Sequence, residues 1–314
     1  MIKIRKIATL LFCVVSIVLT AQDEKISLWG KDVPNQQRTD EREKLVSANI
    51  IRISNVQNPL IEVYLPSKSN ANGQAMLIFP GGGYGILAYD WEGTDVAKVL
   101  NAKGIAGIVV KYRLPNSKSI KVKHLAPLQD AQRAMRLVRA NAEKWNIDKN
   151  QIGVIGFSAG GHLTSTIGTH YMDEVYQKRD SVDNLSARPD FMALIYPVIT
   201  FLNEKVMHKG SRNNLLGDLK DNVELNKHFS NELHVTKETP PAFLVHAQDD
   251  RGVPVENSLL FYKALRKENV PVEIHLYPKG GHGFSLAIKN KHLSTWTTRL
   301  TDWVLLQKDK KSEK

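Results

Sequence analysis

Residues 151–166 read QIGVIGFSAGGHLTST. The first six of them have the apolar character of a buried strand, and residues 161–166 continue as a helix. Between the two, Gly156 and Gly160 each stand two positions from Ser158. This spacing is typical of a sharp, strained strand-to-helix turn, at which larger flanking residues would collide with neighbouring backbone. Such a turn would push the Ser158 hydroxyl into a cleft, so Ser158 is the candidate nucleophile. The alternative is a glycine-rich turn with an idle serine.

The rest of the chain alternates between expected strands and expected helices. Strands are expected at residues 50–54, 60–65, 75–79, 105–112, 152–157, 191–196, 242–246 and 272–277, and helices at 95–103, 128–145, 255–266 and 295–306. This alternation predicts an α/β fold with a mostly parallel central sheet and helices on both faces. Two long polar stretches, Tyr171–Pro189 and Thr200–Pro240, do not fit it. We expect these insertions to form a small cap above the sheet.

The beginning of the chain is expected to be a separate unit. Three basic residues precede an apolar run at residues 7–19, and small residues follow. This pattern predicts a secretory signal peptide over residues 1–21, with an uncleaved anchor as the alternative. We expect residues 22–314 to form one α/β domain without a membrane span, in which residues 22–45 are a polar arm. The mature protein is therefore expected to be periplasmic or secreted.

Composition excludes several kinds of chemistry. The only cysteine, Cys13, lies within the predicted signal peptide, so we expect neither a disulfide nor a catalytic thiol in the mature chain. The formal charge is +11, but no interleaving of aromatic and basic residues indicates a nucleic-acid platform. The histidines lack the His-Glu-x-x-His spacing of a zinc protease, and we expect no metal and no cofactor.

A serine hydroxyl needs a base, and the base needs an acid that orients it. His282 is the candidate base, because it lies in a glycine-rich segment directly after the expected strand at 272–277. The acid should follow the strand at 242–246, where Asp249 and Asp250 are adjacent. We favour Asp250, because Asp-Arg-Gly-Val-Pro is the usual sequence around such an acid, and Asp249 stays the alternative. The order serine, aspartate, histidine is that of α/β-hydrolases.

Backbone amides are expected to stabilise the oxyanion. One donor is the amide of Ala159, directly after the nucleophile. The others should come from residues 80–85, Pro-Gly-Gly-Gly-Tyr-Gly, which follow the strand at 75–79, and we favour Gly82 and Gly83. A phosphate-binding loop would require a lysine and then serine or threonine, whereas Tyr84 follows these glycines.

Two aromatic residues after the glycine run are candidates for substrate contact. Tyr84 adjoins the expected oxyanion donors, and Trp91 could stack on a sugar ring. Packing of Trp91 beneath the loop is an equally good interpretation. Glu92 is expected to organise the loop, and His162 is expected to support the site or to pack.

Together these motifs resemble those of an α/β-hydrolase of the secreted bacterial carbohydrate-esterase type. The segments that carry the resemblance are residues 80–84, 111–115, 156–163, 249–258 and 280–284, together with Ile26-Ser27-Leu28-Trp29. The chain is similar to acetyl xylan esterases and to bifunctional acetyl xylan/feruloyl esterases, which share Pro80 where many lipases have histidine. The resemblance implies an acylated carbohydrate such as xylan as substrate. A prolyl-oligopeptidase-like peptidase and a general short-chain carboxylesterase are the alternatives, and the oligomeric state is left open.

Overall fold

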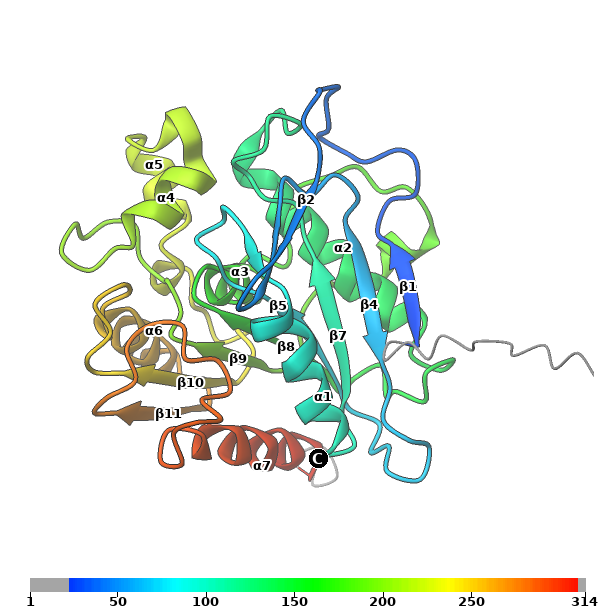
Figure 1. Ribbon diagram of the computed structural model, residues 1–314, viewed down its shortest axis with the longest axis vertical. Coiled ribbons are helices and arrows are strands. Elements are labelled where there is room, and N and C mark those ends of the chain that lie inside the picture. The colour runs from blue at the N-terminus through cyan, green and yellow to red at the C-terminus, as the bar shows by residue number, and fades with distance from the viewer. Residues whose placement is uncertain (1–22, 310–314) are drawn as a thin grey trace, which may run out of the picture.

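A computed structural model describes residues 23–309 of the protein (Figure 1). The predicted signal peptide over residues 1–21 therefore lies outside the described residues. Within residues 23–309, no helix is both long and apolar enough to cross a bilayer.

The centre of the molecule is an eight-stranded sheet in the order β1-β4-β7-β5-β8-β9-β10-β11. Its strands are β1 (Glu24–Ser27), β4 (Leu60–Tyr64), β5 (Ala75–Phe79), β7 (Ala106–Lys111), β8 (Ile152–Phe157), β9 (Met192–Ile195), β10 (Ala242–Ala247) and β11 (Val272–Tyr277). In this order, the six strands β7, β5, β8, β9, β10 and β11 pair in parallel with their neighbours. β4 pairs antiparallel with both β7 and β1. β5 and β8 are fully buried apolar runs, as expected for strands covered on both faces.

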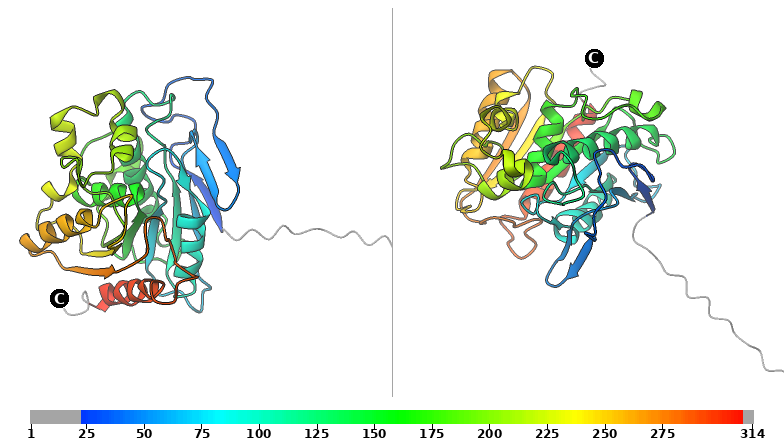
Figure 2. Two further views of the ribbon diagram at one scale, coloured as in Figure 1. Left: turned by 60° about the vertical axis from the view of Figure 1, so that its left-hand side comes forward. Right: turned by 90° about the horizontal axis from the view of Figure 1, so that it is seen from above.

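Helices cover both faces of this sheet (Figure 2), which confirms the predicted fold class. The helices along residues 23–309 are α1 (Asp95–Asn101), α2 (Ala126–Ala140), α3 (Ala159–Thr169), α4 (Lys209–Leu216), α5 (Val223–His228), α6 (Glu256–Lys267) and α7 (Thr295–Asp309), of which α4 and α5 belong to the inserted stretch at residues 200–240. α2 and α3 pack against each other on one face, and α1 and α7 lie on the other. The carboxyl ends of the parallel strands meet at one edge, where ligands bind in open α/β sheets.

The first described segment differs from the expected polar arm. β1 pairs antiparallel with β4 as the edge strand of the main sheet, with Ile26 opposite Ile61. At the other end of the arm, β2 (Lys44–Ser47) joins β3 (Ile51–Ser54) and β6 (Leu87–Ala88) in a separate three-stranded sheet. β1 and β2 have four residues each, and an alternation of polar and apolar residues over so short a segment does not identify a strand.

A buried ion pair holds the segment after β1 against the domain. The Arg113 guanidinium and the Asp130 carboxylate have no exposed side-chain surface and are 2.8 Å apart. The Trp29 indole N–H donates to the Asp130 Oδ1 at 2.7 Å, and Arg113 also donates to the Pro34 carbonyl. This group ties residues 29–34 to α2.

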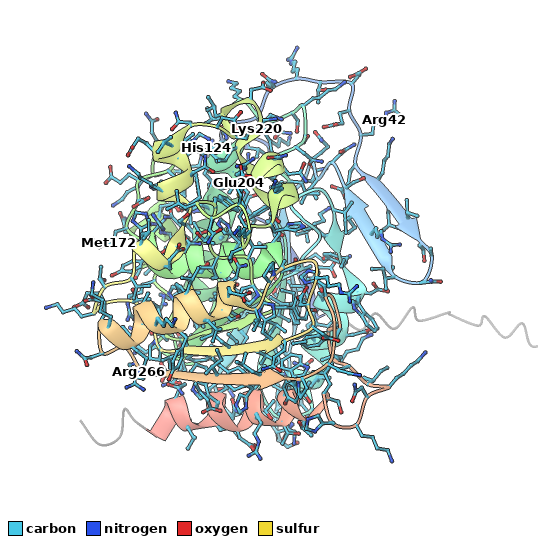
Figure 3. All side chains as sticks on the ribbon, turned by 90° about the vertical axis from the view of Figure 1, so that its left-hand side faces the viewer. Arg42, His124, Met172, Glu204, Lys220 and Arg266 are labelled. Atoms are coloured by element: carbon cyan, nitrogen blue, oxygen red, sulfur yellow. The ribbon has the colours of Figure 1, made fainter. Side chains whose placement is uncertain are left out.

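The inserted stretch at residues 200–240 carries α4 and α5, which stand beside each other at the upper left of Figure 1. In Figure 3 the labelled side chains of Glu204 and Lys220 mark the same segment. The other predicted insertion, residues 171–189, contains a 3-10 turn at Ser181–Asn184. The segment 200–240 is called the cap below.

Candidate active site

Ser158 lies at the turn between β8 and α3, with φ of 53° and ψ of −117°. A non-glycine residue in this region of backbone space is strained, typically by about 1–3 kcal/mol. The flanking glycines explain how the turn is possible. A Cβ on Gly156 would lie 2.1 Å from the Gly160 carbonyl oxygen, and one on Gly160 would lie 2.0 Å from that of Phe79. The predicted strand, turn and helix are thus all present.

The structure brings Ser158, His282 and Asp250 together, although 124 and 32 residues separate His282 from the other two. His282 Nε2 lies 2.8 Å from Ser158 Oγ, and His282 Nδ1 lies 2.7 Å from Asp250 Oδ2. Because a carboxylate can only accept, Nδ1–H donates to Asp250. Nε2 then keeps its lone pair for the serine proton. The arrangement follows from parallel strands, since β8, β10 and β11 deliver the three residues to one edge.

Asp250 is held by several donors. Its Oδ1 accepts the amides of Gly252 and Val253, each at 2.8 Å. His246 Nε2 lies 3.3 Å from Oδ2 and also donates to the Val253 carbonyl. Burial alone raises the pKa of Asp250, but hydrogen bonds from His246 and His282 outweigh it and hold that pKa well below its usual value. The acid therefore remains a carboxylate beside His282.

The neighbouring Asp249 has a different position. Its Oδ1 accepts the amides of Gly280 and Gly281, each at 2.8 Å, and these bonds hold its pKa below its usual value. Asp249 thus anchors the glycine-rich loop that carries His282. Of the two aspartates that the sequence left open, the structure places Asp250 against the imidazole.

The glycine loop after β5 provides amides without partners. Gly82 and Gly83 have φ of +129° and +63°, and within residues 23–309 their N–H groups have no hydrogen-bond acceptor. The Ala159 N–H is at the first position of α3, where helices leave amides unpaired. The Tyr112 hydroxyl donates to the Pro80 carbonyl at 2.7 Å and so supports the beginning of the loop.

Glu92 connects this loop to the loop that carries His282. It lies in a short π-helical turn, Asp90–Thr94, and is 4% exposed. Its Oε2 accepts the Gly81 N–H at 2.8 Å, and its Oε1 accepts the Tyr196 hydroxyl at 2.7 Å. The Tyr196 oxygen accepts in turn from the Ser285 N–H. Burial raises the pKa of Glu92, while the hydrogen bonds from Tyr196 and Gly81 oppose that rise. Its position fits the expected organising role.

Tyr84 points inward, unlike a residue that contacts substrate. Its side chain is 1% exposed, and its hydroxyl donates to His162 Nδ1 at 2.8 Å. His162 Nε2 donates to the Phe229 carbonyl of the cap, and burial lowers the pKa of His162 to about 4. His162 therefore stays neutral and connects the glycine loop to the cap. The ring of Tyr84 is not available for the predicted substrate contact.

Trp91 is half-buried beside the loop that carries His282. Its indole N–H donates to the Gly283 carbonyl at 2.9 Å. It also lines a pocket of about 320 Å³, together with apolar residues that include Phe284, Ile288 and Leu293. Both interpretations of Trp91, packing and ligand contact, are therefore compatible with its position.

Two cap residues that sequence reasoning missed reach the site. Asn214 in α4 donates to the Gly83 carbonyl at 2.7 Å and so fixes the glycine loop. His208 lies near Gly83, and burial together with nearby His282 lowers its pKa. Nothing in the sequence relates these residues to the glycine loop, because the contact depends on how the cap folds back. The predicted place of this insertion beside the site is thus observed.

Comparison with known proteins identifies relatives of this chain. The family model BD-FAE matches residues 61–265. The acetylxylan esterase of Xylanibacter ruminicola is 37% identical over 77% of this chain and 47% of its own length. The endo-1,4-beta-xylanase B of Butyrivibrio fibrisolvens is 37% identical over 71% of this chain and 34% of its own length. The chain thus spans about half or less of the length of these curated relatives.

A solved structure matches over nearly all of both chains. The acetyl ester-xyloside bifunctional hydrolase from Caldicellulosiruptor lactoaceticus is 40% identical, with a TM-score of 0.76. The match covers 91% of this chain and 97% of the other. The family model covers about two thirds of the chain, and the TM-score supports the fold described above. The chain therefore belongs to the BD-FAE family of α/β-hydrolase enzymes.

Proposed function

We propose that the protein is a serine esterase that removes acetyl groups from xylan or a related polysaccharide. The observation that carries the proposal is the hydrogen-bonded chain from Ser158 through His282 to Asp250, beside the unpaired amides of Gly82 and Gly83. The acetyl and xylan specificity is supported by the names of two relatives, an acetylxylan esterase and an acetyl ester-xyloside hydrolase.

The mechanism follows from the positions of these groups. Ser158 Oγ attacks the ester carbonyl carbon while His282 Nε2 takes its proton, and Asp250 stabilises the imidazolium. The amides of Gly82, Gly83 and Ala159 donate to the oxyanion of the tetrahedral intermediate. His282 then protonates the departing sugar oxygen, which leaves an acetyl-serine. Water, deprotonated by His282, attacks the acetyl carbonyl. His282 then returns that proton to the departing Ser158 Oγ, which releases acetate and regenerates the enzyme.

The direct test is acetate release from acetylated xylan by the wild type and by Ser158→Ala. We expect the variant to lose about three or more orders of magnitude in turnover. Ser69→Ala is the matched control, because Ser69 lies on an exposed loop and its hydroxyl pairs with that of Ser67, away from the site. Release by Ser158→Ala at the wild-type rate would refute the assignment.

A substrate panel distinguishes the alternatives. Fast cleavage of 4-nitrophenyl acetate without release from acetylated xylan would indicate a general short-chain carboxylesterase. Cleavage of a proline-containing peptide without ester cleavage would indicate a prolyl-oligopeptidase-like peptidase. Feruloyl ester cleavage is an additional activity that we propose for the same serine, and it should be lost together with deacetylation in Ser158→Ala.

We also propose that Trp91 contributes to substrate binding through the pocket beside the His282 loop. Its half-buried ring and the apolar lining of that pocket support the proposal. Trp91→Phe keeps a ring but loses the hydrogen bond to Gly283, whereas Trp91→Ala loses both. A rise in KM for polymer that appears in Trp91→Ala but not in Trp91→Phe is expected. Equal KM values in Trp91→Ala and Trp91→Phe would contradict a role of the ring in binding.

We also propose that the protein is periplasmic or secreted, on the strength of the predicted signal peptide over residues 1–21. We expect expression with the full leader to place the protein in the periplasm or the medium. Intact mass should then show loss of the first 20 or 21 residues, because the predicted cleavage follows Thr20 or Ala21. An uncleaved chain in the membrane fraction would instead indicate an anchor.

A further inference from the structure

Three histidines from separate segments meet at the end of α3 opposite to Ser158. His170 directly follows α3, His228 is the last residue of α5, and His234 follows a 3-10 turn at Asn231–Leu233. The His170 ring centroid lies 4.5 Å from that of His228 and 4.6 Å from that of His234. In Figure 3, the exposed Met172 marks the chain just beyond His170.

Each histidine can offer one nitrogen to a common point. The three candidate ligand atoms all lie within 4.8 Å of one another. His170 is 5% exposed, and its Nε2 has no hydrogen-bond partner although it is buried. A buried polar atom without a partner costs free energy, so such atoms in proteins usually have a ligand, a water or a functional role.

Hydrogen bonds made by His170 and His234 leave one ring nitrogen of each unprotonated, as a metal ligand requires. The Thr169 hydroxyl donates its only hydrogen to the Ser165 carbonyl at 2.9 Å. It must therefore accept in its 2.7 Å hydrogen bond with His170, whose Nδ1–H is the donor. His170 Nε2 is then unprotonated. Likewise His234 Nε2 donates to the Lys227 carbonyl at 3.0 Å, which leaves its Nδ1 as an acceptor. Metal-binding histidines commonly donate their second N–H in this way.

The charges around the cluster also suit a cation. A carboxylate adjoins the cluster, because Asp173 Oδ2 lies 3.8 Å from His228 Nε2. Three imidazoles with an adjacent carboxylate or water form a donor set that Zn²⁺ accepts.

We propose that His170, His228 and His234 bind one Zn²⁺ ion, with the fourth position open to Asp173 or to water. With Zn–N bonds of about 2.0–2.1 Å, tetrahedral coordination puts ligand nitrogens about 3.3 Å apart. The largest separation between two ligand nitrogens, which is at most 4.8 Å, must therefore shrink by up to about 1.5 Å when the ion binds. His228 and His234 are half-buried in the cap and can supply this movement, while His170 stays fixed at the end of α3.

The consequence of such an ion is to clamp the cap to α3. The two already share polar contacts, because Asn231 donates to Ser165 Oγ at 2.7 Å and to Thr166 Oγ1 at 3.0 Å. The cap also holds the glycine loop through Asn214 and Gly83. A clamped cap would therefore stabilise the domain on the side that faces the site. This inference does not depend on the esterase proposal.

The test uses the full mature chain without a histidine tag, stripped of metal by a chelator. Calorimetric titration with Zn²⁺ should show one site per chain, and Co²⁺ should give the intense visible absorption of tetrahedral coordination. A Zn²⁺ concentration one hundred times the Kd should shift the folding equilibrium constant by about 100-fold, which raises the thermal midpoint. His228→Ala and His234→Ala should each weaken binding by at least 10-fold and abolish the Co²⁺ absorption.

His292→Ala is the matched control, because His292 is exposed and lies outside the cluster. It should bind Zn²⁺ as the wild type does. Both cluster variants change half-buried positions, and their folding is checked by circular dichroism before titration. Undiminished Zn²⁺ binding in His228→Ala, absence of binding in the wild type, or an octahedral Co²⁺ spectrum would each overturn the proposal.

Discussion

Replacing Glu92 should loosen the glycine loop and so slow catalysis without touching the catalytic residues. The carboxylate accepts the Gly81 N–H and the Tyr196 hydroxyl at 2.8 and 2.7 Å, inside the protein. In Glu92→Ala both donors lose their acceptor. Each buried donor left unpaired costs about 1–3 kcal/mol, so for the two donors we expect the free energy of unfolding to fall by about 2–6 kcal/mol.

The kinetic effect follows from the neighbouring amides. Gly81 directly precedes Gly82, whose N–H is a proposed oxyanion donor worth about 3 kcal/mol when well placed. Displacing that donor without removing it should cost part of this amount, so we expect kcat to fall about 10- to 100-fold. KM for a small acetyl ester should change little, because the oxyanion interaction strengthens mainly in the transition state.

Glu92→Gln separates geometry from charge. The amide keeps the shape and one acceptor, so its losses in unfolding free energy and in kcat should be smaller than those of Glu92→Ala. The assay is kcat and KM for 4-nitrophenyl acetate at a temperature where every variant is folded, with unfolding by urea measured in parallel. Glu256→Gln, an exposed acid in the first turn of α6, is the control. A folded Glu92→Ala enzyme with kcat within twofold of wild type would refute the reasoning.

Further predictions concern the acids and the buried ion pair. Asp250→Asn should lower kcat by about four orders of magnitude, because the tautomer of His282 is no longer fixed. Asp249→Asn should lower kcat roughly 10-fold, because the loop that carries His282 is held less firmly. The ester assay described above measures both. Because the folded-state pKa of Asp250 lies below its ordinary value of 3.8, its contribution to stability is present above about pH 4 and is lost as pH falls below it. Urea unfolding measured from pH 5 downward should therefore show a shallower loss in Asp250→Asn than in wild type, and equal slopes would contradict this. Asp130→Ala should lower the unfolding free energy by about 3–5 kcal/mol, because it leaves the Arg113 guanidinium buried and unpaired, while kcat of the remaining folded enzyme stays near wild type.

The parts of the site that the sequence predicted are those fixed by local constraints. Gly156 and Gly160 are required because any side chain there would meet backbone, so the turn around Ser158 is encoded within five residues. Asp250 and His282 follow strands that can be predicted from their apolar runs, and parallel strands bring their carboxyl ends to one edge. Sequence alone could therefore relate residues that are far apart in the chain.

The parts that the sequence did not predict depend on contacts between distant segments. Tyr84 is aromatic and follows a glycine loop, but whether its ring points outward or toward His162 depends on the packing of α3 and the cap. Asn214 reaches the glycine loop, and His228 and His234 reach His170, only after the cap folds back, and no spacing motif marks these residues. Edge strand β1 has four residues, so its partner, not its pattern, defines it.

The measurement that tests the central claim most directly is the mapping of the covalent intermediate. Enzyme is mixed with excess 4-nitrophenyl acetate, quenched in acid within its first turnovers, digested and analysed by mass spectrometry. We predict one acetyl group on the peptide that contains Ser158, and none on that peptide in Ser158→Ala. An acetyl group on another residue, or rapid acetate release by Ser158→Ala, would contradict the account.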